Sequence, residues 1–385
     1  MKMGIKDIIV WRIIPGLAVA IAAAAGFFLS HEFPFAFIFA TVVPLSNGVL
    51  PPSVVGHGKM RGTPEVPSDL MPLPRPKDEL FLDLPGGGKL PQQGIGMCCR
   101  ATATDDVLVY RTVLWYLLLG GRHIDGAHVY WNHAAIGRGI SEAIRRGVPR
   151  EEIFVTTKIF PTHFGFESTK ENVQNYLREL GLGYIDMVLL HWPQNFPLLS
   201  SPCQKEGKSR SECRRETWRA LSNLREEGLI KNAGVSNFSL KHIKELEGFG
   251  APIANNQISF HPFEPDHVME TVKYCQSNGI TVTAYSPLGL TSITICSGMR
   301  DKDRAHANNL LRELSSKYGK NVSQIMLRWA VQTGCAVIPG TGNPDHMKEN
   351  LSVYEFYLRD EDMDAINQLK HVAEGFTHVD VRQLE

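Results

Sequence analysis

Hydrophobic positions along the chain fall into eight short apolar runs, each of which ends near a polar residue and is followed by an amphipathic stretch. The runs are QQGIGM (92–97), RHIDGA (122–127), IFVTTK (153–158), IDMVLLH (185–191), NAGVSN (232–237), ANNQIS (254–259), TVTAYS (281–286) and AVIPGT (336–341). Apolar strands that alternate with helices are typical of a parallel sheet covered by helices, and eight such units close into a barrel. The pattern therefore predicts an α/β fold of the (β/α)8 TIM barrel type.

The segments between the runs have helical spacing. In STKENVQNYLRELGL, for example, Val173, Tyr176, Leu177 and Leu180 share one face and Gly181 is a stop signal. A doubly wound sheet is the alternative, but no GxGxxG motif opens a first helix. Ahead of the first unit, FLDLPGGGKLPQQGIGM has two apolar runs joined by a glycine turn, which predicts a β-hairpin that caps the amino-terminal end of the barrel.

The N-terminus has a different pattern. Lys2, Lys6 and Arg12 precede an apolar run over residues 13–29, and a second run covers 33–45. The first run is shorter than the ~20 residues of a membrane span, so a cleaved signal, a signal anchor and a membrane hairpin all remain open. Eight prolines between residues 44 and 76 indicate a linker. We therefore divide the chain into a hydrophobic targeting or membrane segment (1–46), a Pro-rich linker (47–77) and the barrel (78–385).

Charge and cysteine usage narrow the classes of partner and compartment. The 385 residues contain 40 Lys+Arg and 40 Asp+Glu without a basic block, so nucleic acid is not an expected partner. Seven scattered cysteines lack CxxC pairs or histidines at zinc spacing, and no metal site is expected. We interpret them as mostly free thiols in a reducing compartment, with a zinc site or a disulfide framework as the alternative.

Candidate chemistry lies at the ends of the runs, because the carboxyl ends of barrel strands form the active-site face. The residues there are Asp125, Lys158, His191, Ser236, Asn237, Gln257, Tyr285 and Thr341, and Tyr130 follows Asp125 by five positions. Taken singly, Asp125 is explained as a helix N-cap, Lys158 as a solvated loop end and His191 as a core histidine. Their convergence on one mouth favours catalysis.

Together these side chains predict a tuned acid. A tyrosine with a pKa of ~10 is a weak donor at neutral pH, and we expect Lys158 to lower the pKa of Tyr130. Asp125 would pair with Lys158, while a neutral His191 would donate a hydrogen bond to a substrate carbonyl. Neither an activated nucleophile nor a metal cage accompanies them. A nicotinamide cofactor would therefore supply hydride.

From about Leu80 to Leu369 the chain resembles the aldo-keto reductase superfamily, in particular its monomeric reductases of the aldose reductase and diketogluconate reductase type. The matching stretches, in family order, are GRHIDGAHVYWN, FVTTKIF, LGLGYIDMVLLHWP, GLIKNAGVSNF, NNQISFHP, VTAYSPLG and VIPGTGNPDHMKEN. The resemblance implies a monomeric barrel with a catalytic tetrad of Asp125, Tyr130, Lys158 and His191.

The same resemblance implies a cofactor site and a substrate pocket. Ser236, Asn237 and Gln257 would hold the nicotinamide carboxamide, Tyr285 would stack on the ring, and Ser286 and Leu288 would lie along the pyrophosphate. Other implied cofactor contacts are Gly96, Met97 and Asp125, with Thr341, His346, Glu349 and Asn350 at the adenosine end. The implied substrate pocket consists of Cys98, Trp131, Phe160 and Trp192.

Several positions depart from the family pattern. Gly340 and His346 stand where relatives that prefer NADPH usually have lysine and arginine, so NADPH is expected with NADH as a live alternative. Met97 and Cys98 replace a threonine and an aromatic residue, which predicts a wider pocket or a thiol whose oxidation inhibits turnover. His133 replaces a glutamate, for which the sequence offers no reason. The basic loop 203–215 is either a solvated lid or an attractor of anionic substrates.

The expected function is reduction of an aldehyde or ketone to an alcohol with NAD(P)H, and the alternatives are a cofactor-sensing regulatory subunit with little turnover and a redox sensor that acts through Cys98. We expect a membrane-associated protein with its barrel in a reducing compartment, either the cytosolic face or an organelle interior. Unpaired cysteines support this, as do glycosylation sequons at Asn237, Asn321 and Asn350, two of which fall on implied cofactor positions. The ER lumen or secretory pathway is the alternative.

Overall fold

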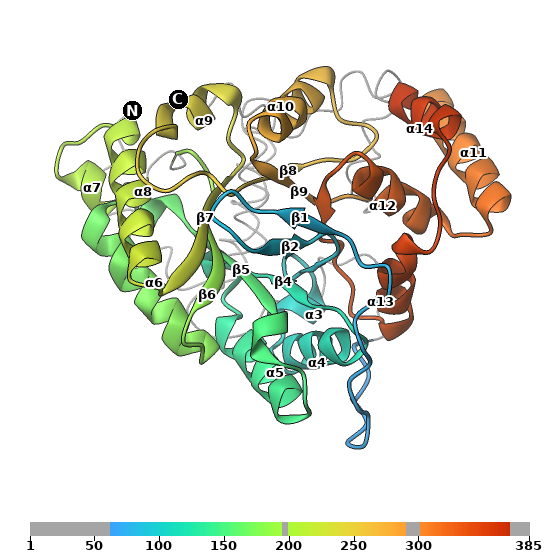
Figure 1. Cartoon of the computed structure of the whole chain (residues 1–385), viewed down its shortest axis with the longest axis horizontal. Helices are drawn as coiled ribbons and strands as arrows, with labels where there is room; N and C mark the ends of the chain where they lie inside the picture. The colour runs from blue at the N-terminus through green and yellow to red at the C-terminus, as the bar shows by residue number, and fades with distance from the viewer. Residues whose placement is uncertain (1–61, 195–198, 290–300, 370–385) are drawn as a thin grey trace, which may run out of the picture. The chain divides into compact units, whose positions relative to one another are not determined.

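The computed structural model describes residues 62–194, 199–289 and 301–369 (Figure 1). The predicted hydrophobic segment 1–46 and the first part of the predicted linker lie outside the described residues. Residues 62–77, which the sequence assigns to the linker, lie along the first long helix of the barrel. Trp115 donates its indole N–H to the Pro64 carbonyl at 3.0 Å, and the Leu73 amide donates to the Leu118 carbonyl at 2.7 Å.

Eight parallel strands form the central sheet, and each overlaps one of the eight predicted runs. They are β3 (Ile95–Gly96), β4 (His123–Asp125), β5 (Phe154–Ile159), β6 (Ile185–Leu190), β7 (Ile230–Ser236), β8 (Asn255–Ser259), β9 (Thr281–Tyr285) and β10 (Ala336–Val337). Each strand pairs with the next in chain order. A parallel bridge between Gln93 and Val337 joins the last strand to the first, so the sheet closes and the barrel prediction is confirmed.

Helices surround the strands (Figure 1). The described α-helices are α3 (Ala101–Thr104), α4 (Asp106–Leu118), α5 (His133–Arg145), α6 (Phe166–Leu180), α7 (Pro202–Lys205), α8 (Arg210–Glu226), α9 (Leu240–Leu246), α10 (Asp266–Ser277), α11 (Asp301–Tyr318), α12 (Val322–Gln332), α13 (Pro344–Leu351) and α14 (Asp360–Asn367). As predicted, α6 buries Val173, Tyr176 and Leu180 and ends at Gly181, whose φ of 66° favours glycine. Among the helices within the described ranges, none is long and apolar enough to cross a bilayer.

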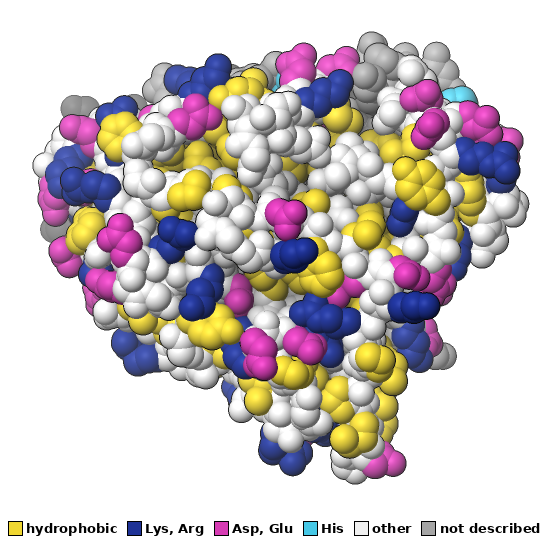
Figure 2. All heavy atoms as spheres, viewed as in Figure 1, with side chains coloured by type: hydrophobic (Ala, Val, Ile, Leu, Met, Phe, Trp, Pro, Cys, Tyr) yellow, Lys and Arg dark blue, Asp and Glu magenta, His cyan; other side chains and the backbone are white. Residues whose placement is uncertain are grey.

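The predicted hairpin is present and closes one end of the barrel. Strands β1 (Phe81–Asp83) and β2 (Lys89–Pro91) pair antiparallel. Leu84 and Leu90 are buried against Phe154, Met187 and Leu189 from the barrel strands, and this apolar plug is separate from the larger core between sheet and helices. Because the hairpin closes this end, a ligand can enter only at the opposite end of the barrel, at the carboxyl ends of the strands. On the face shown in Figure 2, basic and acidic side chains are intermingled.

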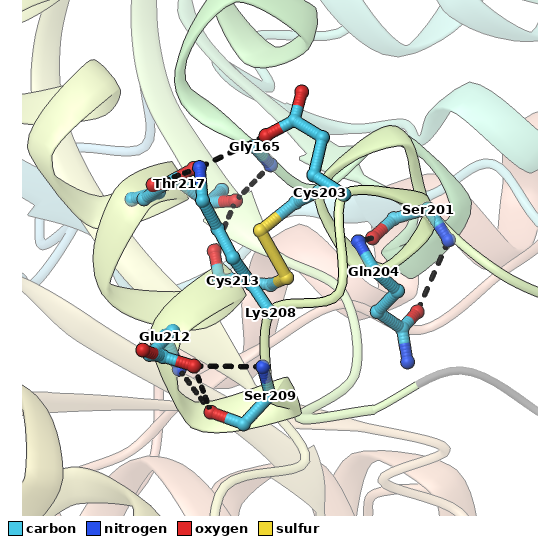
Figure 3. The surroundings of a disulfide bond; sticks show 11 residues. Gly165, Ser201, Cys203, Gln204, Lys208, Ser209, Glu212, Cys213 and Thr217 are labelled. Carbon is cyan, nitrogen blue, oxygen red and sulfur yellow. Dashed lines mark hydrogen bonds and ion pairs between the residues drawn. A yellow bond between two sulfur atoms is a disulfide. The ribbon is translucent and has the colours of Figure 1, made fainter.

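Four cysteines are paired, so the interpretation of the cysteines as mostly free thiols was wrong for them. Cys203 and Cys213 form a disulfide with their Cα atoms 5.7 Å apart (Figure 3), and the neighbours Cys98 and Cys99 form another. Cys275 and Cys335 are free and buried. The spacing of ten residues carries no recognisable disulfide signature. The pair forms because the chain turns back between α7 and α8.

N-terminal caps on α7 and α8 stabilise the turn between these two helices. Ser201 caps α7 and accepts a hydrogen bond from the Gln204 amide at 3.2 Å, and Ser209 caps α8 and accepts one from the Glu212 amide at the same distance. A Cβ atom on Gly165, just before α6, would lie 3.2 Å from the Cβ atom of Cys203. The disulfide therefore ties α7 to α8 beside the start of α6.

Replacing both Cys203 and Cys213 with serine should lower the free energy of unfolding by about 3 kcal/mol, because the loop that the disulfide closes regains conformational freedom in the unfolded chain. Urea unfolding of the oxidised proteins measures this difference. Dithiothreitol should destabilise the wild-type chain to a similar extent and leave the double variant nearly unchanged. A wild-type unfolding curve that does not respond to reductant would contradict the structural role of this disulfide.

Candidate active site

All four residues of the predicted tetrad meet at the open end of the barrel. Asp125 is the last residue of β4, Lys158 lies near the end of β5, and His191 directly follows β6. Tyr130 ends the short 3-10 helix η3 (His128–Tyr130), which begins three residues after β4. Because parallel strands end at the same edge, side chains distant in sequence are brought into one site.

Asp125 and Lys158 form a buried ion pair. The Lys158 Nζ atom donates to Asp125 Oδ1 at 2.6 Å and to the Gly126 carbonyl at 2.9 Å. Gln257 on β8 donates through Nε2 to the other carboxylate oxygen at 2.7 Å. Burial lowers the pKa of Lys158, and the Asp125 carboxylate opposes that shift. Both carboxylate oxygens are thus satisfied, and the pair is fixed by strands on opposite sides of the barrel.

The expectation that Lys158 lowers the pKa of Tyr130 was wrong for this structure. Removal of the phenol from water raises its pKa well above the usual value, and the charge of Asp125 raises it further. The Lys158 ammonium lies 5.1 Å from the centre of the Tyr130 ring, but its hydrogen bonds are made to Asp125 and Gly126. Tyr130 is therefore a neutral phenol at physiological pH, which is the form that can donate a proton.

His191 is neutral, as predicted. Burial holds the pKa of its imidazole well below the usual value, and the positive charge of Lys158 lowers it further. Its ring lies edge-on to the Tyr130 ring, with 5.8 Å between centroids. The backbone amide of His191 donates to the Ile159 carbonyl at 2.9 Å, which fixes the residue to the end of β5. A neutral imidazole beside a neutral phenol can orient a carbonyl oxygen for protonation.

The residues implied for the nicotinamide carboxamide and for stacking on its ring lie side by side on β7, β8 and β9 and just after β7. Ser236 Oγ donates to the Gln257 carbonyl, and the Tyr285 hydroxyl donates to Asn237 Oδ1, both at 2.9 Å. Asn237 Nδ2 donates to the His191 carbonyl at 2.9 Å. A carboxamide has both N–H donors and an acceptor oxygen, so this set of amides and hydroxyls fits it.

The backbone is in the left-handed region at two of these positions. The φ angle is 62° at Asn237 and 49° at Ser286, conformations that cost free energy for residues other than glycine. Leu288, implied for the pyrophosphate, is half-buried and follows Ser286 by two residues. Strained backbone gathered at a mouth of this kind is a common property of ligand sites.

The residues implied for the adenosine end lie on the segment that follows β10. Thr341 Oγ1 accepts from the Asn343 amide at 3.1 Å, and His346 on α13 is exposed. Asn350 is buried, and Glu349 is half-buried beside it. Across the rim, Gly96 ends β3, and the amide of the adjacent Met97 donates to the Asp125 carbonyl at 2.9 Å.

Aromatic side chains surround His191 as predicted for the pocket. The Phe160 ring lies edge-on at 5.9 Å from the imidazole, and the Trp192 ring is stacked at 6.4 Å. Trp131 is 58% exposed at the rim. Cys98 is half-buried and bonded to Cys99, so the hypothesis of a free Cys98 thiol does not hold in this structure.

The structure gives His133 a role that the sequence did not reveal. Its Nε2 atom lies 2.8 Å from Thr157 Oγ1 on β5, and its Nδ1 atom lies 2.9 Å from Glu179 Oε2 on α6. His133 is buried at the start of α5. It therefore ties two helices to the strand that carries Lys158.

Among the five basic residues in the loop 203–215, Lys208 and Arg214 form ion pairs that offset their charge. Lys208 contacts Glu206 at 2.9 Å and Glu216 at 2.6 Å, and Arg214 contacts Glu245 at 2.6 Å. Neighbouring carboxylates offset the positive field that would attract an anion. Of the two interpretations of this loop, the pairing favours a solvated lid.

Sequence reasoning missed two groups near the site. Arg100 follows β3, and its guanidinium lies beside Gly340. Glu264 is buried with its Oε1 atom 3.1 Å from His261 Nε2, and burial raises the pKa of its carboxyl to about 7. The run HPFE contains both of the latter residues, but only the turn after β8 brings them together.

Comparison with known proteins assigns the chain to a family. The model of the Aldo/keto reductase family matches residues 86–371. The chain is 34% identical to 9,11-endoperoxide prostaglandin H2 reductase of Trypanosoma cruzi, over 73% of this chain and 88% of that protein. It is also 34% identical to glycerol 2-dehydrogenase (NADP(+)) of Saccharomyces cerevisiae, over 75% of this chain and 90% of that one.

Solved structures of aldo-keto reductases are similar to this chain in fold. The aldo-keto reductase of Bombyx mori in complex with NADP has a TM-score of 0.67 and 31% sequence identity, covering 77% of this chain and 93% of that structure. An aldo-keto reductase complexed with NADPH has a TM-score of 0.65 and 30% identity, covering 76% of this chain and 88% of that structure. With the tetrad assembled at the mouth of a closed barrel, the chain belongs to the aldo/keto reductase family and is an oxidoreductase that reduces carbonyl compounds.

Proposed function

We propose that this enzyme reduces an aldehyde or ketone to an alcohol with NADPH as hydride donor and Tyr130 as proton donor. The observation that carries the proposal is the buried Asp125–Lys158 pair beneath a neutral Tyr130 and a neutral His191. A relative whose name specifies NADP(+) and two neighbours solved with NADP or NADPH support the choice of cofactor. The barrel would act as a monomer.

When bound, the reduced nicotinamide supplies the hydride that adds to the carbonyl carbon. Ser236, Asn237 and Gln257 would hold its carboxamide. His191 donates a hydrogen bond that places the substrate oxygen, and Tyr130 transfers its hydroxyl proton to that oxygen. Asp125 and Gly126 keep the Lys158 ammonium near the phenol, where its positive charge favours the phenolate that forms as the proton leaves.

The pocket favours a substrate with an apolar group beside its carbonyl. Phe160 is buried against His191, and Trp192, whose ring is stacked on the imidazole, is half-buried. Such walls exclude water and accept hydrocarbon surface. A screen over aldehydes, ketones and sugars, run in parallel with NADPH and NADH, tests both substrate class and cofactor. Tight cofactor binding without oxidation across the whole panel would instead support a cofactor-sensing subunit.

Tyr130→Phe should lower kcat for carbonyl reduction at least ~100-fold, because the phenylalanine ring has no proton to donate. The dissociation constant for NADPH, measured by quenching of protein fluorescence, should stay within about twofold of the wild-type value because the ring is retained. Retained turnover would rule out Tyr130 as the acid.

The pH profile of kcat for reduction should be flat through neutral pH and fall only above about pH 10. The acid must be protonated, and burial and Asp125 raise the pKa of Tyr130 above its usual value of ~10, so the active form persists to high pH. Steady-state rates at saturating NADPH across buffers of constant ionic strength check this. A decline centred near pH 7 would mean that the phenol pKa is lowered in the working enzyme.

Asp125→Asn should lower the free energy of unfolding by about 3–5 kcal/mol, because it leaves the Lys158 ammonium buried without its counter-ion. Urea unfolding gives the measurement. In a matched control, Asp125→Asn combined with Lys158→Met removes both charges and should recover part of the loss. A single variant as stable as the wild type would show that the pair is not charged.

We further propose that the barrel folds in an oxidising compartment, entered through the hydrophobic segment 1–46, which acts as an anchor or is removed. This is the ER lumen or secretory alternative. The Cys203–Cys213 pair supports it. Asn237 and Asn350 are buried in the fold, so this proposal requires that folding hides these two sequons before they are glycosylated.

Expression of the full chain in eukaryotic cells, followed by thiol labelling under denaturing conditions, tests the compartment. Cys203 and Cys213 should resist a maleimide–polyethylene glycol reagent until reduced, and the barrel should be protected from added protease in intact microsomes. Labelling of both cysteines before reduction, together with digestion by the protease, would place the barrel in the cytosol.

A further inference from the structure

Gly340 makes room for Arg100. A Cβ atom on Gly340 would collide with the Nη1 atom of Arg100 and lie 2.8 Å from its Cζ atom. Gly340 does not have a positive φ angle, so the backbone itself would accept another residue. A side chain at position 340 would therefore have to displace the guanidinium, which is the far end of a flexible side chain. The guanidinium occupies the volume that a side chain on the β10 segment would otherwise fill.

The guanidinium is held beside the end of β3. Arg100 donates from Nη1 to the Cys98 carbonyl at 3.2 Å, and its Nη2 atom lies 4.0 Å from Met97 Sδ. Gly96 precedes these residues, and its carbonyl would lie 3.3 Å from a Cβ atom on Gly340. The arginine thus lies where the end of β3 meets the residues that follow β10.

We propose that Arg100 binds a phosphate group of the cofactor and supplies a positive charge that positions 340 and 346 lack. This deepens the proposed function and rests on it. Gly340 has no side chain and His346 is exposed, so the β10–α13 segment brings no arginine or lysine to its first residues. The planar guanidinium has a fork of N–H donors that matches phosphate oxygens. Burial lowers the pKa of Arg100 to about 10, which leaves it charged at neutral pH.

The alternative for Arg100 is a purely structural role in the 97–100 turn. The two roles predict different effects of a positive charge that is placed at position 340 after Arg100 has been removed. If the charge binds phosphate, a lysine at position 340 can replace it once the arginine has gone, because both side chains share one volume. If Arg100 only supports its own turn, a lysine on the opposite segment restores nothing.

The test measures dissociation constants for NADPH and NADH by fluorescence quenching. Arg100→Ala should weaken NADPH binding about tenfold or more, since a charge-assisted contact is lost. Arg100→Ala combined with Gly340→Lys should recover most of that affinity. Arg100→Ala combined with Gly340→Ala refills the space without charge and should recover none. Arg138→Ala, on the exposed face of α5, should leave both constants unchanged.

The pattern across the two cofactors identifies the phosphate. A loss for NADPH alone assigns Arg100 to the 2′-phosphate, and an equal loss for both assigns it to the pyrophosphate. Unchanged constants in Arg100→Ala, or a lysine at 340 that restores nothing, would overturn the proposal. If the alanine variant does not fold, as judged by circular dichroism, Arg100→Gln takes its place. A wild-type chain that binds neither nucleotide would refute the proposed function itself.

Discussion

The buried contact between Asp125 and Lys158 is the constraint on which the site depends. Either charge left alone inside the barrel would cost several kcal/mol, which is a large part of the free energy of unfolding of a single domain. Gln257 satisfies the second carboxylate oxygen from the opposite wall. Strands β4, β5 and β8 must therefore keep their positions relative to one another along the barrel axis. A shift of one strand along that axis would leave a buried charge unsatisfied.

This constraint also explains why the phenol stays protonated although the sequence suggested a lowered pKa. From the sequence, a lysine close to a tyrosine implies a lowered pKa of the phenol. That expectation takes only the positive charge of the lysine into account. In the structure the carboxylate that neutralises Lys158 also acts on Tyr130, and the loss of hydration has the larger effect. The acid is held in its protonated form before substrate arrives, and its ionised form is favoured only during the reaction.

The fold and the tetrad could be predicted because both depend on local patterns. Eight apolar runs become eight strands, since a strand buried on both faces needs a continuous apolar stretch, and chemistry at their ends follows from parallel pairing. The remaining features depend on contacts between distant segments. His133 acquires its partners only when β5 and α6 pack beside it. Arg100 and Gly340 are far apart in sequence, and only closure of β3 against β10 shows that they share one volume.

The disulfide between Cys203 and Cys213 also determines the consequence of proteolytic cleavage between these two residues. Residues 205–207 are exposed and lie inside the covalent ring that this bond closes. A protease that cut there would produce two polypeptides that still travel as one molecule, with the strands before the cut and those after it joined through sulfur. Such nicked enzyme would be indistinguishable in mass from the intact chain except for one added water, and only reduction would separate its halves.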